Sequence, residues 1–323
     1  MTAGNKELSW SLTKARTFEE CPRRYYYHYY LSRAGNVFDA PDEARLALEM
    51  KGIQSLDMWA GEVVHSTIQW TLEAIRGGGT PSAEEARAEA KRRLSRGWRG
   101  SAGKLWKTEP KGGHANLFEH YYGMAVGDKA VERVKDKTYV SVRSFMESDI
   151  LREIAGAPAD RWLPIEKYAS FRMDGLLVYV KFDFALRDGA QLTVYDWKTG
   201  KPTAQELLQL TVYAMYASDK WGVPIENTKV CAVHLHPELD PREHLIGVPE
   251  MDEVREHLKQ SFKGMVSHLR NPSRDIAAMD DFPMTGNLAR CPRCNFKGIC
   301  PQSRIAEGRL DDEDVPIPDD WEL

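Results

Sequence analysis

The sequence lacks several features that would assign it at once to a broad class of proteins. It has no run of eighteen or more apolar residues, so it contains no predicted membrane-spanning helix. It has no G-x-x-x-x-G-K-S/T segment, so we expect no P-loop nucleotide hydrolysis. Residues 1–17 lack the apolar centre of a secretory signal, which favours a cytoplasmic location.

The sequence also lacks an excess of positive charge and an even number of cysteines. The net charge is −4 over 323 residues, so any nucleic-acid binding must come from local patches. The five cysteines are an odd number, and without a secretory signal we expect metal or cluster ligation rather than disulfides. With 42% apolar and 28% charged residues, the chain is an ordinary globular sequence, long enough for one large domain or two small ones.

The middle of the chain contains a predicted β-hairpin with candidate active-site residues. Leu176–Leu186 and Gln191–Trp197 are rich in β-branched and aromatic residues, and the Asp188-Gly189 pair between them is a strong turn signal. Side chains alternate along a strand, so three polar residues are expected on one face of this hairpin. They are Asp183, Asp196 and Lys198.

A turn at that dipeptide brings two carboxylates close together. Asp183 then lies opposite Val194 and Asp196 opposite Lys181, so the two aspartates are diagonal neighbours, roughly 7 Å apart or less at Cβ. Such carboxylates repel unless a cation lies between them, and Mg²⁺ commonly uses one or two carboxylates and a substrate phosphate. Lys198 reaches the same place, where an ammonium can orient a water or stabilise phosphate charge. The alternative is a solvated hairpin with two surface acids.

Two predicted helices carry further candidate residues. Residues 57–76 have the apolar spacing of an amphipathic helix, with His65 near its middle, where a structural role is the alternative to metal ligation. A second helix, about 204–221, is expected to begin at a Thr203–Glu206 capping box. It places two polar side chains on one face, Gln209 and Tyr213.

Residues 91–111 are the predicted DNA-binding surface. This segment contains eight basic residues and a single acid, with tryptophans interleaved. Basic side chains neutralise phosphates and aromatic faces stack unpaired bases, so we expect a single-strand track, with a solvated basic face as the alternative. The candidate contacts are Arg92, Arg93, Arg96, Trp98 and Arg99. The segment lies in a predicted helical insertion, residues 77–158, within a single domain of residues 1–323; its first helix should open with a capping box at Ser82–Glu85.

Four of the five cysteines have the spacing of metal ligands. Three follow the pattern C-x₂-C-x₅-C in residues 291–300, and a tetrahedral centre requires a fourth, for which Cys21 is the natural candidate. A zinc ribbon usually has two C-x-x-C pairs, and this chain has one. The predicted ligands are Cys21, Cys291, Cys294 and Cys300. Cys231 lies in a predicted buried strand, residues 228–236, and is expected to be an inert thiol.

Together these motifs resemble the PD-(D/E)XK nucleases, in particular their RecB/AddB-like branch. Asp183 and the triplet Asp196-Trp197-Lys198 resemble the metal-binding core of that family. One departure is Lys181, because the family often has a small residue two positions before the first aspartate. The resemblance covers residues 8–33, 57–76 and 164–302.

Other motifs support the resemblance in the expected order along the chain. Gly61-x-x-x-His65 resembles the helix whose histidine binds the metal, and Gln209-x-x-x-Tyr213 resembles the motif that contacts DNA and supports the site. The Cys-Pro-Arg-Arg-Tyr segment at Cys21 resembles the start of the iron–sulfur members.

The resemblance implies an α/β fold, with a restriction-endonuclease-like core, a mixed central sheet and an Fe–S staple joining the N- and C-terminal segments. It implies that a 4Fe–4S cluster is bound by the four cysteines, with zinc as the alternative. It also implies that Lys198 positions the attacking water beside Mg²⁺ or Mn²⁺. The implied metal ligands are His65, Asp183, Asp196 and the backbone carbonyl of Trp197.

The implied activity is hydrolysis of DNA with single-stranded ends by an exonuclease. A helicase or recombination protein is the implied partner, and no membrane association is expected. The alternative is a non-catalytic DNA-binding subunit, stapled by iron–sulfur or zinc, of a repair, recombination or CRISPR-adaptation complex. The acidic tail, residues 303–323, is expected to be flexible.

Overall fold

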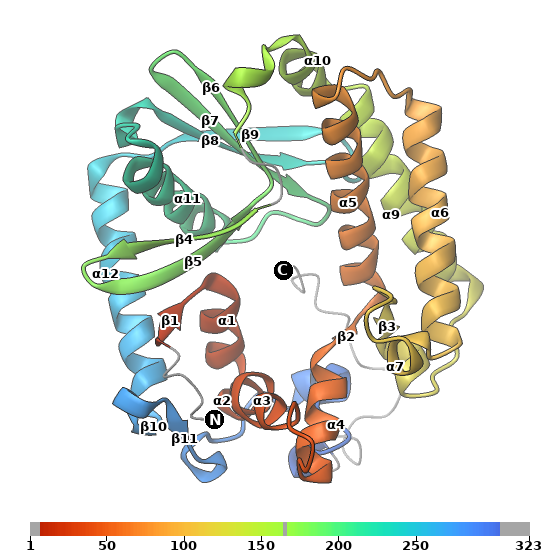
Figure 1. Cartoon of the computed structure of the whole chain (residues 1–323), viewed down its shortest axis with the longest axis vertical. Helices are drawn as coiled ribbons and strands as arrows, with labels where there is room; N and C mark the ends of the chain where they lie inside the picture. Colours follow the sequence, from red (N-terminus) through yellow and green to blue (C-terminus); the bar gives the residue numbers. More distant parts are fainter. Residues whose placement is uncertain (1–6, 164–166, 304–323) are drawn as a thin grey trace. The chain divides into compact units, whose positions relative to one another are not determined.

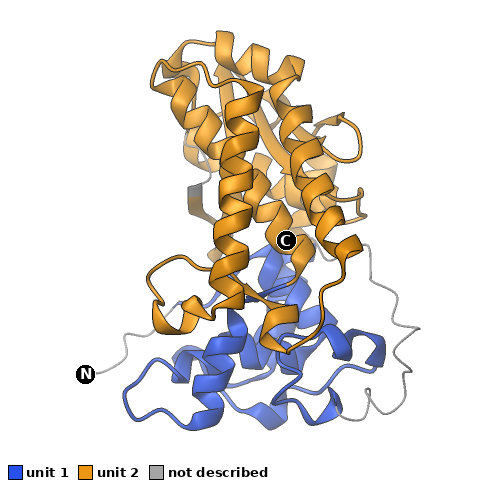
Figure 2. Cartoon of the chain, turned by 90° about the vertical axis from the view of Figure 1, so that its right-hand side faces the viewer, with its two compact units in different colours: residues 1–54, 257–318 blue, residues 55–256, 319–323 orange. Residues whose placement is uncertain are grey.

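The computed structural model describes residues 7–163 and 167–303. These residues fall into two units (Figure 2), which we describe separately. Unit 1 contains residues 7–54 and 257–303, and unit 2 contains residues 55–163 and 167–256. Apart from Ser303, the predicted tail lies outside the described residues.

A four-stranded mixed sheet forms the centre of unit 2 (Figure 1). Its strands are β6 (Phe184–Asp188), β7 (Gln191–Lys198), β8 (Thr228–His234) and β9 (Asp240–Leu245), in the order β6–β7–β8–β9. β7 and β8 are parallel and the two outer pairs are antiparallel. Parallel neighbours need a crossover connection, and α11 (Glu206–Trp221) supplies it. The mixed central sheet predicted from the sequence is confirmed.

The hairpin before this sheet differs from the prediction. β4 (Lys167–Met173) pairs antiparallel with β5 (Leu176–Phe182) through a turn in which Asp174 and Gly175 both have positive φ. The predicted strand Leu176–Leu186 is therefore not continuous. It breaks at Asp183, because its first half pairs with β4 and its second half, β6, pairs with β7.

The register of the β6–β7 hairpin also differs from the prediction. Asp188 lies opposite Gln191, and the two-residue turn is Gly189-Ala190 instead of Asp188-Gly189. Gly189 has φ +60°, which suits the first central position of a type II′ turn. Every partner therefore moves by two residues. Because side chains alternate with period two, the shift leaves each side chain on its predicted face.

Helices make up the rest of unit 2. α5 begins at the N-cap Ser55, and α6 begins with the predicted capping box between Ser82 and Glu85. The bounds are α5 Leu56–Arg76, α6 Ala83–Ala102, α7 Leu105–Thr108, α8 Phe118–Tyr121, α9 Asp128–Met146 and α10 Asp149–Gly156, with β3 at Asn116–Leu117.

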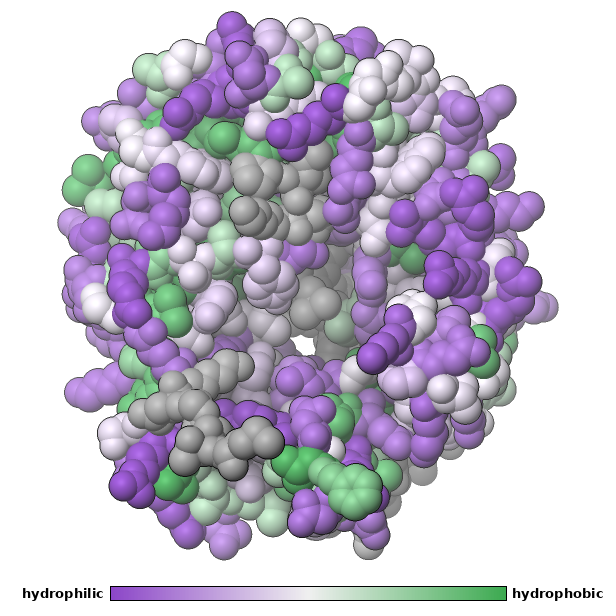
Figure 3. Space-filling view, in the orientation of Figure 1, coloured by the Kyte–Doolittle hydropathy of each residue, from purple (hydrophilic) through white to green (hydrophobic). Residues whose placement is uncertain are grey.

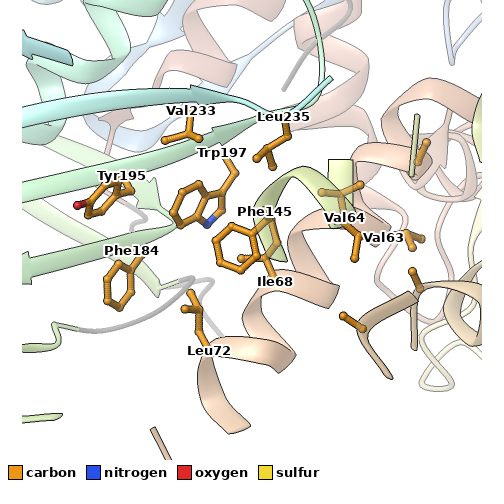
Figure 4. Packing of buried hydrophobic residues seen from close by; sticks show 14 of the residues in the cluster. Val63, Val64, Ile68, Leu72, Phe145, Phe184, Tyr195, Trp197, Val233 and Leu235 are labelled. Carbon is orange, nitrogen blue, oxygen red and sulfur yellow. The ribbon is translucent and has the colours of Figure 1, made fainter. Parts of the chain in front are cut away.

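The main hydrophobic core of unit 2 lies between the sheet and two of these helices, α5 and α9 (Figure 4). Ile68 and Leu72 of α5 contribute to it, and the Phe145 ring of α9 lies 5.1 Å from the Trp197 ring of β7. Trp197 thus faces α9, so its neighbour Asp196 faces the other side of the sheet, where α11 lies.

Unit 1 is built from short helices and turns. Its N-terminal part contains β1 (Ser9–Trp10), α1 (Leu12–Glu20), α2 (Pro22–Tyr26), a π-helical turn (Tyr27–Leu31), α3 (Ser32–Ala34), α4 (Asp42–Lys51) and β2 (Ile53–Gln54). Its C-terminal part contains the short pair β10 (Leu269–Asn271) and β11 (Ile276–Ala277). Helix α12 (Val248–Ser267) includes the boundary between the two residue ranges.

Aromatic packing joins the two parts of unit 1. Tyr25, Tyr26 and Tyr30 surround the fully buried ring of Phe282, and Tyr27 packs against Phe296. The Arg23 side chain also donates to the carbonyl oxygen of Phe282 at 2.8 Å. The N- and C-terminal parts are therefore held together without any bound group.

Across the described ranges, no helix is long and apolar enough to cross a bilayer. The molecular face drawn in Figure 3 is mainly hydrophilic, with apolar side chains in small groups.

Candidate active site

Unit 2 brings six of the predicted site residues onto four neighbouring elements. Asp183 lies in the break between β5 and β6, and Asp196 and Lys198 lie at the end of β7. The other three are His65 on α5 and Gln209 and Tyr213 on α11. The break at Asp183 is therefore the point where the chain leaves one strand pair and enters the central sheet.

Asp183 is buried and connects α5 to β7. Its Oδ1 lies 3.1 Å from Nδ1 of His65, and its Oδ2 accepts a hydrogen bond of 2.6 Å from the backbone N–H of Trp197. An ionised carboxylate only accepts, so the His65 contact requires a proton on Nδ1. The family resemblance implied a metal-ligand role for the Trp197 carbonyl, whereas the contact in the structure uses the Trp197 N–H.

Asp196 and Lys198 form a buried ion pair. Nζ of Lys198 lies 2.7 Å from Oδ2 of Asp196, and both side chains are at most 10% exposed. The pair does not have hydrogen-bond geometry at that oxygen, so Oδ2 of Asp196 has charge compensation but no hydrogen-bond donor. The expected pairing of Asp196 with Lys181 is wrong, since Lys181 is exposed and lies opposite Tyr168 in β4.

A chain of hydrogen bonds continues from Lys198 into α11. Nζ of Lys198 donates to Oε1 of Gln209 at 2.7 Å, and Nε2 of Gln209 donates to the Tyr213 hydroxyl at 2.7 Å. That hydroxyl donates to the backbone oxygen of Lys181 at 2.5 Å. The predicted four-residue spacing of Gln209 and Tyr213 thus aligns them toward the lysine of the site.

The Tyr213 hydroxyl acts as a neutral donor in this chain. Burial, and then the charges of Asp196 and Asp183, raise the pKa of Tyr213 well above its usual value. Its single proton goes to the carbonyl oxygen of Lys181, so the 3.4 Å contact with Oδ1 of Asp196 is the weaker one. Tyr213 therefore ties α11 to the end of β5.

The donor atoms suit a hard divalent cation. Two buried carboxylates and an imidazole are oxygen and nitrogen ligands of the kind that Mg²⁺ or Mn²⁺ takes, and Oδ2 of Asp196 lacks a hydrogen-bond donor. In the structure, within the described ranges, no three His, Cys, Asp or Glu side chains lie close enough together to form a group that could hold a metal ion. The residues thus fit an ion by chemistry, although Lys198 now compensates the charge of Asp196.

A second buried pair supports the site and was not expected from the sequence. Nε2 of His234 lies 3.1 Å from Oε2 of Glu206, and Nδ1 of His234 lies 3.0 Å from the backbone oxygen of Gly200. The contacts join the end of β8, the loop after β7 and the first turn of α11. The predicted capping box at Thr203–Glu206 is wrong, because the N-cap is Gln205 without a side-chain bond, and Glu206 faces His234 instead.

The predicted DNA-binding residues of segment 91–111 lie on α6, and their side chains already make contacts inside unit 2. Arg92 and Arg93 both form ion pairs with Glu89, which lowers the positive charge that they present to a phosphate. The side chain of Trp98 is half-buried, with its ring 6.4 Å from that of Trp59 and 4.6 Å from that of His120. Arg96 and Arg99 are exposed and bond to backbone oxygens of Gly112 and Ser95.

The four candidate cluster cysteines all belong to unit 1. Burial raises the pKa of Cys291, and the nearby Cys300 and Cys21 thiols raise it further. Burial likewise raises the pKa of Cys294 to about 11, and Cys21 and Cys300 also act on it. Cys21 and Cys300 therefore lie near enough to influence both Cys291 and Cys294, although the four thiols do not form a ready metal site.

The fifth cysteine lies elsewhere. Cys231 is buried in β8, and its burial raises its thiol pKa to about 12. It is thus a protonated core thiol at neutral pH.

The family model of the PD-(D/E)XK nuclease superfamily matches residues 9–301. The chain belongs to this superfamily. A search of the curated proteins returned no match. The family assignment therefore comes from the match over most of the chain, and it agrees with the resemblance inferred from the Asp183 and Asp196-Trp197-Lys198 motifs.

Solved structures that are similar to this chain include the following two. One, a protein named SSO0001, is 16% identical, with a TM-score of 0.28, and the match covers 54% of this chain and 80% of that protein. The other, from Eubacterium rectale and named as a candidate exonuclease, is 12% identical, with a TM-score of 0.30, covering 85% of this chain and 94% of that protein. These low scores carry no argument about function.

Proposed function

We propose that this superfamily member is a Mg²⁺- or Mn²⁺-dependent deoxyribonuclease that acts as an exonuclease on DNA with single-stranded ends. The observation that carries the proposal is the continuous polar chain from Asp196 through Lys198 and Gln209 to Tyr213. A solvated hairpin would not bury an acid–lysine pair and link the lysine to two side chains of a crossover helix.

Different residues of the chain are proposed to have different roles in phosphodiester hydrolysis. His65, Asp183, Asp196 and the Trp197 carbonyl are the proposed ligands of the divalent ion. When bound, that ion supplies Lewis-acid polarisation of the phosphate and lowers the pKa of a water. A ligand role for His65 would use Nε2, since its Nδ1 contacts Asp183, an arrangement in which a carboxylate orients a metal-binding imidazole.

Lys198 is the proposed group that orients the attacking water and stabilises the phosphate charge. Gln209 restricts its ammonium, and Tyr213 in turn restricts Gln209. Gln209 and Tyr213 are also the proposed contacts to the DNA strand beside the site. The exposed arginines of α6 are proposed to bind strand phosphates, and Trp98 would stack a base only by giving up some of its packing against Trp59 and His120.

The proposal includes the RecB/AddB-like branch and a 4Fe–4S cluster held by the cysteines of unit 1. The effect of Cys21 and Cys300 on the pKa values of both Cys291 and Cys294 supports a shared centre. Iron–sulfur and zinc both take four thiolates, so the metal content of the purified protein decides between them. A helicase that supplies unwound ends is the proposed partner.

Digestion of end-labelled single strands, with each end blocked in turn, tests the exonuclease assignment. With Mg²⁺ or Mn²⁺ we expect mononucleotides or short oligonucleotides from strands with a free end, and no product when the required end is blocked. Equal cleavage of strands blocked at both ends would contradict it and indicate an endonuclease. Tight DNA binding without cleavage under any condition would favour the non-catalytic subunit.

A further inference from the structure

Unit 1 contains a pocket that the proposed nuclease chemistry does not use. Its volume is about 320 Å³, and every residue that lines it belongs to residues 7–54 or 257–303. Pockets for small ligands begin at roughly 300 Å³, which accommodates a molecule the size of a mononucleotide. The pocket therefore has a suitable volume for one nucleotide unit.

Cations from three separate helices converge on this pocket. They are Lys14 of α1, Arg33 of α3 and Lys51 at the end of α4. A single solvated helix face would not gather charges from three elements. Two acids, Glu7 and Asp275, also line the pocket, so one positive charge remains in excess, which favours an anionic ligand.

Each of these cations lies close to the ring of a tyrosine. The Nζ atoms of Lys14 and Lys51 lie 5.7 Å and 5.8 Å from the centroid of the Tyr29 ring, and the Arg33 guanidinium lies 5.2 Å from that of Tyr30. Cations within about 6 Å of an aromatic centroid are attracted to the ring face. Flat rings and positive charges thus occur side by side, the combination that binds a base together with its phosphate.

Several of these groups are held in place. Asp275 accepts from the Tyr30 hydroxyl at 2.8 Å and from Arg33 at 2.6 Å, and Lys14 donates to the Ser9 hydroxyl at 2.7 Å. Burial raises the pKa of Tyr30 above its usual value, so its hydroxyl stays a donor to Asp275 at neutral pH. The wall contributed by α12, including Phe262 and Met265, is apolar. A ligand with an apolar or aromatic face and an anionic end matches the two walls.

We propose that this pocket binds one nucleotide unit, with the base against Tyr29 and the apolar wall and the phosphate at Lys14 and Lys51. The choice of a nucleotide over other flat anions rests on the proposed nuclease function. Two ligands contain such a nucleotide unit. One is a free nucleoside monophosphate, which exonuclease action releases, and the other is the 5′-phosphorylated terminal nucleotide of a DNA strand.

Calorimetric titration of the full chain in EDTA tests the pocket without cleavage. The probes are thymidine 5′-monophosphate, thymidine, inorganic phosphate, and tetrathymidylate with and without a 5′-phosphate. We expect the monophosphate to bind more tightly than thymidine or phosphate alone. Lys51→Gln and Tyr29→Leu should each weaken that binding about tenfold or more. Preference for the 5′-phosphorylated tetramer over the free monophosphate would identify the strand end as the source.

Matched variants keep the test independent of folding and of the active site. Lys263→Gln removes an exposed lysine of α12 outside the pocket, and it should leave binding unchanged. Tyr29→Phe keeps the ring and should bind like the wild type, which separates stacking from a folding defect. Wild-type protein that binds the monophosphate but cleaves no DNA in Mg²⁺ or Mn²⁺ would contradict the nuclease proposal alone, so the two proposals fail separately. No binding of any nucleotide probe, or binding unaffected by Lys51→Gln and Tyr29→Leu, would overturn the proposal.

Discussion

Unit 2 and unit 1 bring residues that are distant in the sequence together by different physical means. In unit 2, backbone ladders fix the positions of Asp196 and Lys198, and the parallel register places Lys198 directly beside His234. In unit 1, the N- and C-terminal parts meet through side chains, chiefly tyrosines around Phe282. A hydrogen-bonded strand ladder fixes the register, and so fixes which residues lie opposite each other. Aromatic packing is less specific, because it tolerates several arrangements of the polar groups around the rings.

The difference indicates where each unit is sensitive to substitution. The polar chain of unit 2 depends on single hydrogen-bonded atoms, so exchange of one atom should stop its chemistry while the fold persists. Unit 1 depends on buried volume, so loss of one ring should destabilise it. The proposed cluster would add a cross-link between parts of unit 1 that are already packed together.

The largest expected effect is on the rate of DNA hydrolysis in unit 2. Asp183→Asn and Asp196→Asn keep the size of the side chain but remove a ligand charge, so each should lower the rate about 100-fold or more. Single-turnover cleavage of labelled single strands measures this. The matched control is Asp188→Asn, an exposed aspartate near the tip of the same hairpin, which should cleave like the wild type. Equal rates for all three variants would show that the carboxylates serve structure alone.

The largest expected effect on stability is in unit 1. Phe282→Ala removes a ring that is 0% exposed, and it should lower the free energy of unfolding by about 3–5 kcal/mol. Phe38→Ala removes a ring that is 101% exposed and should change it little. Urea unfolding, monitored by tryptophan fluorescence, compares the two variants. Similar effects of both would mean that aromatic packing does not hold unit 1 together.

The cysteines should matter more for bound metal than for folding. Serine at any one of Cys21, Cys291, Cys294 or Cys300 should abolish the visible absorbance of an anaerobically purified cluster. Because aromatic packing already joins the two parts of unit 1, such variants should remain folded by circular dichroism. Cys231→Ser should keep the cluster. Wild-type protein that contains neither iron nor acid-labile sulfide would contradict the cluster, and stoichiometric zinc would replace it by the alternative centre.

The smallest expected effect is a pH dependence from His28 in unit 1. Burial, and then the charges of Lys51 and Arg24, lower the pKa of His28 to about 3, whereas the unfolded chain should titrate near 6.5. The unfolded state thus binds the extra proton first, so stability is full above about pH 7 and falls as the pH decreases.

When the pH is lowered from 7.5 to 5.0, His28 should reduce the free energy of unfolding by roughly 1–2 kcal/mol. The His28→Gln variant should not show this contribution to the decrease. The difference between the two proteins in urea midpoint at each pH measures it. If the wild type and the variant lost equal stability as the pH is lowered, His28 would not be the group that causes the decrease.

Much of the candidate site could be predicted because its signals are local. The apolar spacing around His65, the alternation through Asp196 and Lys198, and the four-residue spacing of Gln209 and Tyr213 each depend on one helix or strand. The two-residue error in register did not change which side chains share a face. Local pattern therefore predicted the neighbours correctly even where the pairing was wrong.

The remaining features depend on distant partners. The strand break at Asp183 exists because β5 pairs with β4 and β6 with β7, which alternation alone does not reveal. The Glu206–His234 pair joins residues from two separate elements, and a Thr-x-x-Glu pattern looked like an ordinary cap. The packing of Tyr25 against Phe282 spans more than 250 residues, and neither segment carries a pattern that indicates the other.

The measurement that tests the central claim most directly is single-turnover cleavage of end-labelled single-stranded DNA by Lys198→Ala in Mg²⁺ or Mn²⁺. The matched control is Lys229→Ala, which removes a partly exposed lysine of β8 in the same sheet, paired with Glu243. We expect Lys198→Ala to cleave about 100-fold more slowly than the wild type or worse, with its unfolding transition retained, and Lys229→Ala to cleave normally. Wild-type cleavage by Lys198→Ala would contradict the account, because the polar chain from Asp196 to Tyr213 would then not be the active site.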